Sequence, residues 1–143
     1  MTGPTTSPVQ RETTTPEETE AVGAELAARL SPGDVVLVAG ELGSGKTTLV
    51  RGAARALGAD GPVTSPTFTI GHVLPGPVEV AHLDLYRLQS LAGEDPAMLD
   101  DYLTPDRVAF VEWPEAAVPA LERITARVQL EHLGGDRRRI TIA

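Results

Sequence analysis

Cysteine is absent from this 143-residue sequence, and so are long apolar runs. Without cysteine there is no disulfide framework and no thiolate chemistry, so we expect a cytoplasmic protein. No run is long enough to cross a membrane, and the acidic, Thr- and Pro-rich N-terminus is unlike a signal peptide. We therefore expect no membrane partner.

Basic residues are scarce, because 12 lysines and arginines stand against 20 acids and give a net charge of −8. Tight binding to a nucleic-acid backbone requires clustered positive charge, so the negative net charge argues against direct, tight binding of nucleic acid. If RNA is involved, we expect a partner protein to hold it. Lysine itself occurs only once, at Lys46, and the other eleven basic residues are arginines.

The single lysine lies in a motif that binds phosphate. The run Gly40-Glu41-Leu42-Gly43-Ser44-Gly45-Lys46-Thr47 fills every fixed position of the G-x-x-x-x-G-K-[ST] phosphate loop. An apolar stretch at 35–39 predicts a buried strand before the loop, and an amphipathic helix from Thr48 to a stop at a glycine is predicted after it. Lys46 is expected to reach the β- and γ-phosphates, and the Thr47 hydroxyl to bind Mg²⁺.

The alternative is a glycine-rich turn that matches by chance, since the chain has 14 glycines. The single lysine argues against chance, because a compact ammonium on a flexible stem occurs at the one position where the motif needs it. The context of strand, glycine loop and helix start also suits phosphate, since backbone N–H groups and the helix dipole converge there.

A phosphate loop needs a second carboxylate to hold Mg²⁺, directly or through water, at the end of a neighbouring buried strand. Glu112 directly follows the apolar stretch 108–111, and Asp84 ends the stretch 78–83. Either acid could instead be a solvated group at a strand end. The sequence favours Glu112 and leaves Asp84 as the second candidate.

The start of the chain predicts a tail followed by a helix. We expect residues 1–14 to be a disordered tail, because they are rich in Thr, Pro and Ser and poor in large apolar groups. Thr15 fits the N-cap of the first helix, with Pro16 at its first position and Glu18 as the reciprocal capping-box partner. The helix is expected to end before a turn at 32–34.

The remaining pattern predicts an α/β protein. Hairpins are expected over 67–85 and over 125–142, and short helices over 88–103 and 116–123. With the strand at 108–111, these elements predict a P-loop NTPase fold, in which a mainly parallel central sheet with antiparallel additions is flanked by helices. We expect residues 15–143 to form a single P-loop ATPase domain.

Further polar residues near the predicted strands have alternative interpretations. The segment 63–68 carries three hydroxyls that could sense a γ-phosphate or form an ordinary Ser-Pro turn. Alternation places His82, Asp84 and Tyr86 on one face of a strand. Trp113 directly follows Glu112, and it is either a packing residue of the core or rim or a residue near the nucleotide or a docking surface. The arginines at 137–139 form a basic run that is solvated or meets phosphate or adenine.

Four motifs occur in the order Gly40–Thr48, Ser65-Pro66-Thr67-Phe68, His82-x-Asp84-x-Tyr86-Arg87 and Glu112-Trp113-Pro114. Together they resemble the TsaE (YjeE) family, the small bacterial ATPases of tRNA threonylcarbamoyladenosine biosynthesis. The resemblance covers roughly Thr15 to Ile142. The last two motifs at this spacing are specific to the family, whereas the phosphate loop alone indicates only an NTPase.

This resemblance implies binding of ATP and ADP with Mg²⁺ and a set of site residues. It implies Thr47 and Glu112 as the metal ligands and Lys46, Asp84 and Glu112 as the catalytic residues. Nucleotide contacts are implied at Thr15, at each residue from Glu41 to Thr48, namely Glu41, Leu42, Gly43, Ser44, Gly45, Lys46, Thr47 and Thr48, and at Trp113.

The resemblance also implies two partner proteins, the threonylcarbamoyl transferase subunit TsaD and its inactive paralogue TsaB. In that family, ATP hydrolysis supports repeated cycles of tRNA modification, on the adenosine next to the anticodon in tRNAs that read codons beginning with adenine. Contact with tRNA is expected to be indirect, through the complex.

Other classes of P-loop protein are expected to carry different sequence features. A small-molecule kinase is the second hypothesis, with Arg87 and Asp84 near an acceptor, although the chain leaves little room for a lid. A regulatory GTPase is excluded, because its Asn-Lys-x-Asp motif needs a second lysine. A nucleotide-dependent binding module without turnover is the remaining alternative.

Overall fold

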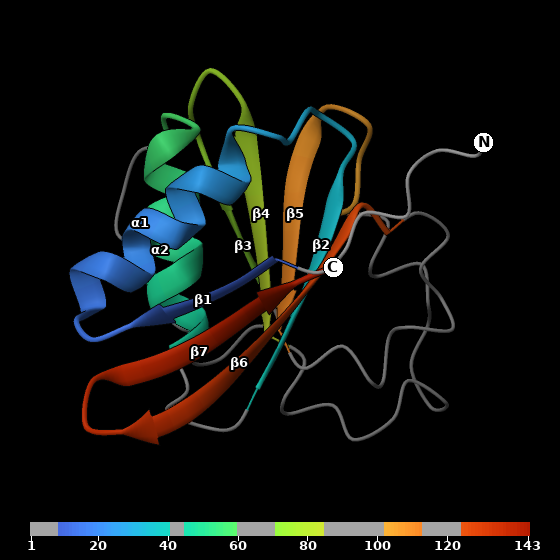
Figure 1. Ribbon diagram of the computed structural model, residues 1–143. Helices are drawn as coiled ribbons and strands as arrows, with labels where there is room; N and C mark the ends of the chain where they lie inside the picture. Colours follow the sequence, from blue (N-terminus) through green and yellow to red (C-terminus); the bar gives the residue numbers. More distant parts are fainter. Residues whose placement is uncertain (1–8, 41–44, 60–70, 85–101, 113–123) are drawn as a thin grey trace.

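The computed structural model describes residues 9–40, 45–59, 71–84, 102–112 and 124–143, and Figure 1 shows how their helices and strands are arranged. No helix within these ranges is long and apolar enough to span a membrane. The described elements are, in chain order, β1 (Val9–Thr13), α1 (Pro16–Ala27), β2 (Val35–Gly40), α2 (Lys46–Ala56), β3 (Gly71–Leu74), β4 (Glu79–Asp84), β5 (Arg107–Glu112), β6 (Ala126–Gly134) and β7 (Arg137–Ile142).

The described strands form one sheet in the order β1-β7-β6-β2-β5-β4-β3. At its centre, β2 pairs in parallel with both β5 and β6, and β4 pairs in parallel with β5. The hairpins β3–β4 and β6–β7 add antiparallel strands on either side. This topology confirms the predicted α/β fold, and it brings the carboxyl ends of β2, β4 and β5 to the same edge of the sheet.

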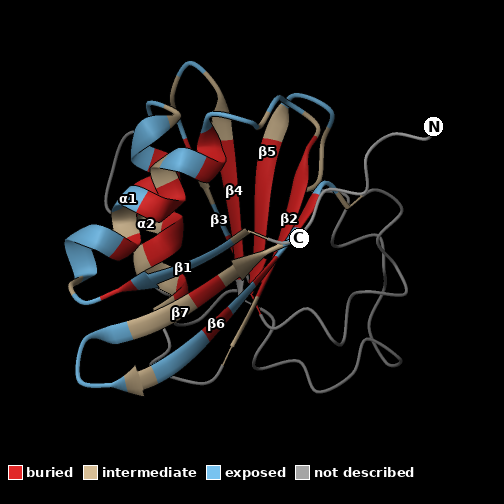
Figure 2. Ribbon diagram, in the orientation of Figure 1, coloured by how far each residue is buried: buried red, intermediate tan, exposed pale blue. Residues whose placement is uncertain are grey.

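The central strands are buried on both faces, which explains their continuous apolar runs. Residues 35–38 of β2 and 108–112 of β5 are all buried, and Figure 2 shows them as the buried centre of the sheet. On one face Val36 and Phe110 pack in a cluster with residues of α1 and α2. On the other face Leu37 belongs to a second cluster. A rigid sheet therefore carries the strand ends that precede the predicted site residues.

Helix α1 begins as the sequence predicts. Thr15 is the N-cap and its hydroxyl accepts a hydrogen bond from the amide of Glu18 at 3.1 Å, with Pro16 at the first helical position. The return bond starts one residue earlier than a capping box predicts, because Glu18 Oε1 accepts from the amide of Thr14 at 2.6 Å. This bond and a second from the Thr14 hydroxyl lower the pKa of the Glu18 carboxyl.

The predicted tail is wrong over its last residues. Val9–Thr13 form β1, which pairs antiparallel with β7 at the edge of the sheet. The Thr13 side chain is buried, and its hydroxyl lies 2.8 Å from that of Thr19 in α1. Local composition misses this strand because its partner is the last strand of the chain. Residues 1–8 lie outside the described ranges.

Helices α1 and α2 lie side by side against one face of the sheet (Figure 1). Two glycines allow their backbones to approach closely. A Cβ atom on Gly23 would lie 2.1 Å from the carbonyl oxygen of Leu49, and one on Gly52 would lie 2.0 Å from that of Glu20. Both distances are far below a van der Waals contact, so neither position accepts a side chain unless the helices separate.

The predicted hairpins and the predicted strand before Glu112 are confirmed where they are described. The terminal hairpin turns at Gly134 and Gly135, whose φ angles of 115° and 55° favour glycine. The helix after the phosphate loop begins two residues before Thr48, at Lys46. The hydroxyl-rich segment 63–68, most of the stretch 88–103 and the segment 116–123 lie outside the described residues.

Candidate functional site

The candidate site begins where β2 ends and α2 starts. The strand ends at Gly40, and α2 begins at Lys46 with Gly45 as its N-cap in the left-handed conformation, at φ 99°. Among the described residues, no side chain caps this helix. The first amides of a helix lack partners within the helix, so an uncapped start presents N–H donors and the positive end of the dipole to an anion.

Lys46 is buried at this helix start, with 5% of its surface exposed. Its Nζ donates a hydrogen bond to the carbonyl oxygen of Gly40 at 2.8 Å. The bond joins the last residue of β2 to the first residue of α2. A buried ammonium is costly unless its hydrogen-bonding groups have partners, and the Gly40 carbonyl supplies one of them.

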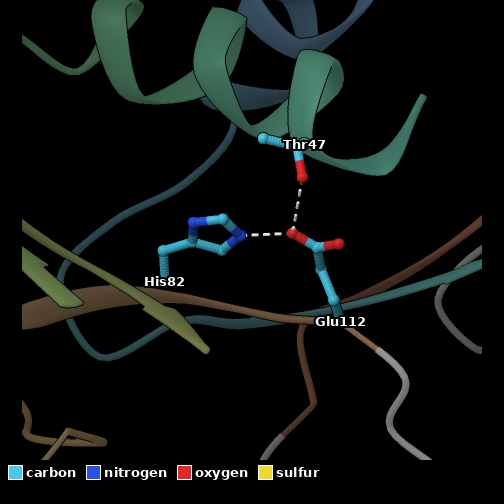
Figure 3. Close-up of polar contacts among 3 residues, drawn as sticks. All are labelled: Thr47, His82 and Glu112. Carbon is cyan, nitrogen blue, oxygen red and sulfur yellow. Dashed lines mark hydrogen bonds and ion pairs between the residues drawn. The ribbon is translucent and has the colours of Figure 1, made fainter. Parts of the chain in front are cut away.

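Glu112 lies at the carboxyl end of β5 and is 2% exposed. Its Oε2 accepts a hydrogen bond from the Thr47 hydroxyl at 3.3 Å and also contacts Nε2 of His82. Figure 3 shows the threonine and the histidine converging on this one oxygen from α2 and β4. The start of the helix and two strand ends therefore meet at a single carboxylate.

The pair of Thr47 and Glu112 suits a magnesium ion. Hydroxyl and carboxylate oxygens are hard ligands of the kind that Mg²⁺ prefers. Adjacent ligands around an octahedral Mg²⁺, at about 2.1 Å from the metal, lie about 3 Å apart, close to the observed 3.3 Å. The described residues hold no cluster of three or more His, Cys, Asp or Glu side chains fit for a metal.

His82 contacts a site residue, although the sequence alone did not assign it to the site. It is 1% exposed, and its Nε2 lies against the Glu112 carboxylate. The available signal was alternation, which places His82 on the same strand face as Asp84. A ring nitrogen on a carboxylate oxygen restricts how that carboxylate can rotate, so His82 acts as a positioning residue for Glu112.

The two candidate carboxylates end neighbouring parallel strands. Asp84 pairs in register with Glu112, so their backbones lie side by side at the carboxyl edge of the sheet. Only the Glu112 side chain is described, and it is the one that contacts Thr47. The sequence offered these two acids as alternative candidates, and the structure places their backbones at the same edge.

The other predicted contact residues are spread over several elements. Thr48 lies in the first turn of α2, and Thr15 caps α1, the helix packed against α2. The Thr15 hydroxyl is already used in its cap. Five predicted residues lie outside the described part of the chain: Glu41, Leu42, Gly43, Ser44 and Trp113.

Comparison with known proteins identifies the family. The family model described as "Threonylcarbamoyl adenosine biosynthesis protein TsaE" matches residues 13–140. The chain belongs to the TsaE family. A TsaE of Streptomyces coelicolor is 42% identical over 119 residues, covering 80% of each chain. A TsaE of Bacillus subtilis is 38% identical, covering 90% of this chain and 81% of the relative.

A solved structure supports the same assignment for the fold. The crystal structure of Bacillus subtilis YdiB superposes with a TM-score of 0.78 at 33% identity, covering 95% of this chain and 84% of that one. TsaE proteins carry the name of tRNA threonylcarbamoyladenosine biosynthesis, so the chain belongs to a tRNA-processing family. TsaE membership and the P-loop fold together indicate a nucleotide-binding protein.

Proposed function

We propose that this chain binds ATP and ADP with Mg²⁺ and hydrolyses ATP in support of tRNA threonylcarbamoyladenosine formation. The modified base is the adenosine next to the anticodon in tRNAs that read codons beginning with adenine. One observation carries the proposal: the Thr47 hydroxyl at the start of α2 lies 3.3 Å from the buried carboxylate of Glu112. Together with Lys46 in the same turn, this pair has the chemistry of a metal–triphosphate site.

Each proposed site residue has a separate role. Lys46 stabilises negative charge on the β- and γ-phosphates, and Thr47 and Glu112 hold Mg²⁺. The metal, when bound, neutralises charge between the phosphates. Asp84 is the second catalytic acid, because its backbone pairs with that of Glu112 at the same edge. His82 fixes the carboxylate of Glu112.

The remaining proposed contacts surround the nucleotide. The phosphate-loop run Glu41-Leu42-Gly43-Ser44-Gly45 supplies backbone N–H groups, as glycine-rich phosphate loops do. Thr48 continues this contact into α2, where the uncapped helix start supports it. Thr15 and Trp113 are proposed to flank the nucleotide from α1 and from the segment after β5.

We also propose that the chain acts in the cytoplasm within a complex of a TsaD-like transferase subunit and a TsaB-like paralogue. The net charge of −8 supports an indirect relation to tRNA, because a phosphate backbone is held by clustered cations. Turnover by the chain alone is expected to be slow and to depend on these partners.

The proposal is tested by measuring release of inorganic phosphate from ATP, with the chain alone and with purified TsaD- and TsaB-like proteins of the same source. Mg²⁺-dependent release that rises with the partners supports it. Binding of ATP without phosphate release under either condition indicates a nucleotide-dependent binding module. Transfer of the γ-phosphate to a small-molecule hydroxyl instead indicates a kinase. Recovery of the two partners in a pull-down with ATP, compared with one without ATP, tests the complex.

Glu112→Gln is expected to weaken the dependence on Mg²⁺ far more than the binding of ADP alone. The carboxylate charge holds the metal, whereas backbone N–H groups hold most of the phosphate. The Mg²⁺ concentration at half-maximal ATPase activity should rise about tenfold or more. ADP affinity measured with EDTA, by calorimetry, should change little.

The matched control for this charge change is Glu131→Gln, which neutralises an acid on the exposed side of β6. Its magnesium titration should match that of the unchanged chain. An unaltered titration in Glu112→Gln would move the metal ligand to Asp84 or to another acid.

The only tryptophan offers an independent readout of binding. Trp113 directly follows the proposed ligand Glu112 and precedes a proline, which restricts the chain after it. Addition of ADP or ATP with Mg²⁺ should therefore shift its emission, since charge and packing change close to the indole. ATP should compete for this signal and GTP should compete poorly, because the chain lacks a guanine-reading Asn-Lys-x-Asp motif.

Lys46→Ala provides the control for this signal, because the same response should then need more nucleotide. A flat emission spectrum at saturating nucleotide, with binding shown by calorimetry, would place Trp113 away from the site. Trp113 would then be better explained as a partner-docking residue.

A further inference from the structure

The β6–β7 hairpin brings an arginine to the start of α2. In Figure 1 the two strands pass beside the lower end of α2, where the helix begins. A Cβ atom on Gly45, the N-cap of α2, would lie 3.5 Å from Nε of Arg138 and 3.6 Å from Cδ2 of Leu130. The Arg138 side chain therefore lies against the last glycine of the phosphate loop.

Strand alternation explains why only one arginine of the basic run reaches this place. Arg138 shares its strand face with Ile140, which is fully buried in the cluster beneath α1 and α2. Arg137 and Arg139 belong to the opposite face. Arg139 lies 3.8 Å from a carboxylate oxygen of Glu12 and 3.7 Å from one of Glu131.

The guanidinium of Arg138 has different partners from that of Arg139. Its Nη1 donates to the carbonyl oxygen of Gly135 at 2.7 Å and to that of Arg137 at 2.9 Å. Among the described residues its hydrogen bonds go to these carbonyls, and no carboxylate pairs with it. The carbonyl bonds hold the side chain in one place, and no acid of the described ranges neutralises the charge of the guanidinium.

We propose that Arg138 is a phosphate-contacting residue of the nucleotide site. This role rests on the nucleotide binding proposed above. Its ligand is the polyphosphate of a nucleoside di- or triphosphate. The two carbonyl bonds use Nη1, so Nε and Nη2 can donate to phosphate oxygens. In a chain of net charge −8, an extra cation at this helix start strengthens the local attraction for phosphate, because its charge adds to the fields of Lys46 and of the helix dipole.

The same contacts allow a purely structural role, in which Arg138 only closes the hairpin turn. The two roles differ in their ligand dependence. A hairpin role predicts a lower melting temperature and an unchanged affinity per folded molecule. A phosphate role predicts a loss of affinity that follows the phosphates and is recovered by another cation at the same position.

The test uses the full chain and calorimetric titration with Mg·ADP, with inorganic pyrophosphate as a competitor. Arg138→Gln should weaken both ligands about tenfold or more, the effect of losing a hydrogen bond to a charged group. Arg138→Lys should recover much of this affinity, because it retains the charge. Arg137→Gln removes one charge from the adjacent residue on the other strand face, and its affinity should stay within about twofold of the unchanged chain.

The outcomes separate the two proposals. If the unchanged chain fails to bind ADP, the proposed function is wrong and the role of Arg138 with it. If the unchanged chain binds ADP and Arg138→Gln binds it equally well, only the role of Arg138 is overturned. A loss for ADP without a loss for pyrophosphate assigns Arg138 to the base or ribose and overturns the phosphate contact. An equal loss in Arg137→Gln would reduce the effect to net charge and also overturn it. Melting curves of each variant show whether it is folded.

Discussion

Lys46→Ala is expected to remove the proposed ATP turnover while leaving the fold in place. In the proposed function its ammonium stabilises charge on the transferred phosphoryl group, and loss of one such donor lowers kcat by at least about 100-fold. Stability should change little, because the substitution also removes a buried charge whose desolvation opposes folding. The measurement is phosphate release at saturating Mg·ATP with the partner proteins present, beside a thermal melt.

Arg55→Gln is the matched control, since it removes one cation from the other end of the same helix. Its side chain is 69% exposed and pairs with Glu20 at 2.9 Å, so turnover should be unaffected. Normal turnover by a folded Lys46→Ala chain would contradict the assignment of the phosphate loop.

Gly52→Ala should destabilise the protein strongly, against the usual helix preference. Alanine stabilises an exposed helix interior by about 1 kcal/mol relative to glycine. Here the new Cβ would lie 2.0 Å from the carbonyl oxygen of Glu20, which is backbone and cannot rotate away. The helices must separate, at a cost of about 3 kcal/mol. The melting temperature should fall by about 6–12 °C for a chain of this size.

Arg55→Ala is the control for this prediction, because it changes an exposed position of α2 and removes only a surface ion pair with Glu20 of α1. It should melt within a few degrees of the unchanged chain. A Gly52→Ala protein as stable as the unchanged chain would mean that α1 and α2 do not approach as closely as their glycines allow.

The sequence predicted those features that depend on local pattern. The cap at Thr15 and Pro16, the buried strand before Gly40 and the hairpin turn at Gly134 follow from short-range chemistry. The sequence also placed Asp84 and Glu112 each at the end of a strand. The pairing of these two residues in register is seen only in the structure.

The features that were missed depend on contacts between distant parts of the chain. The His82–Glu112 contact requires the parallel register of β4 and β5, which no local pattern specifies. Gly23 and Gly52 appear in sequence only as weak helix formers, because the approach of α1 to α2 is visible only in three dimensions. Strand β1 has a single buried side chain, Thr13, and so lacks a hydrophobic pattern.

The pairing of β1 with β7 has a consequence for synthesis on the ribosome. At the edge of the described sheet, the first strand pairs only with the last, from Val9 opposite Ile142 to Thr13 opposite Arg138. The N-terminal strand therefore emerges long before its partner has been translated. Its backbone groups at this edge remain unpaired until the hairpin β6–β7 has left the exit tunnel, so this edge of the sheet is completed only after residue 142 has been translated.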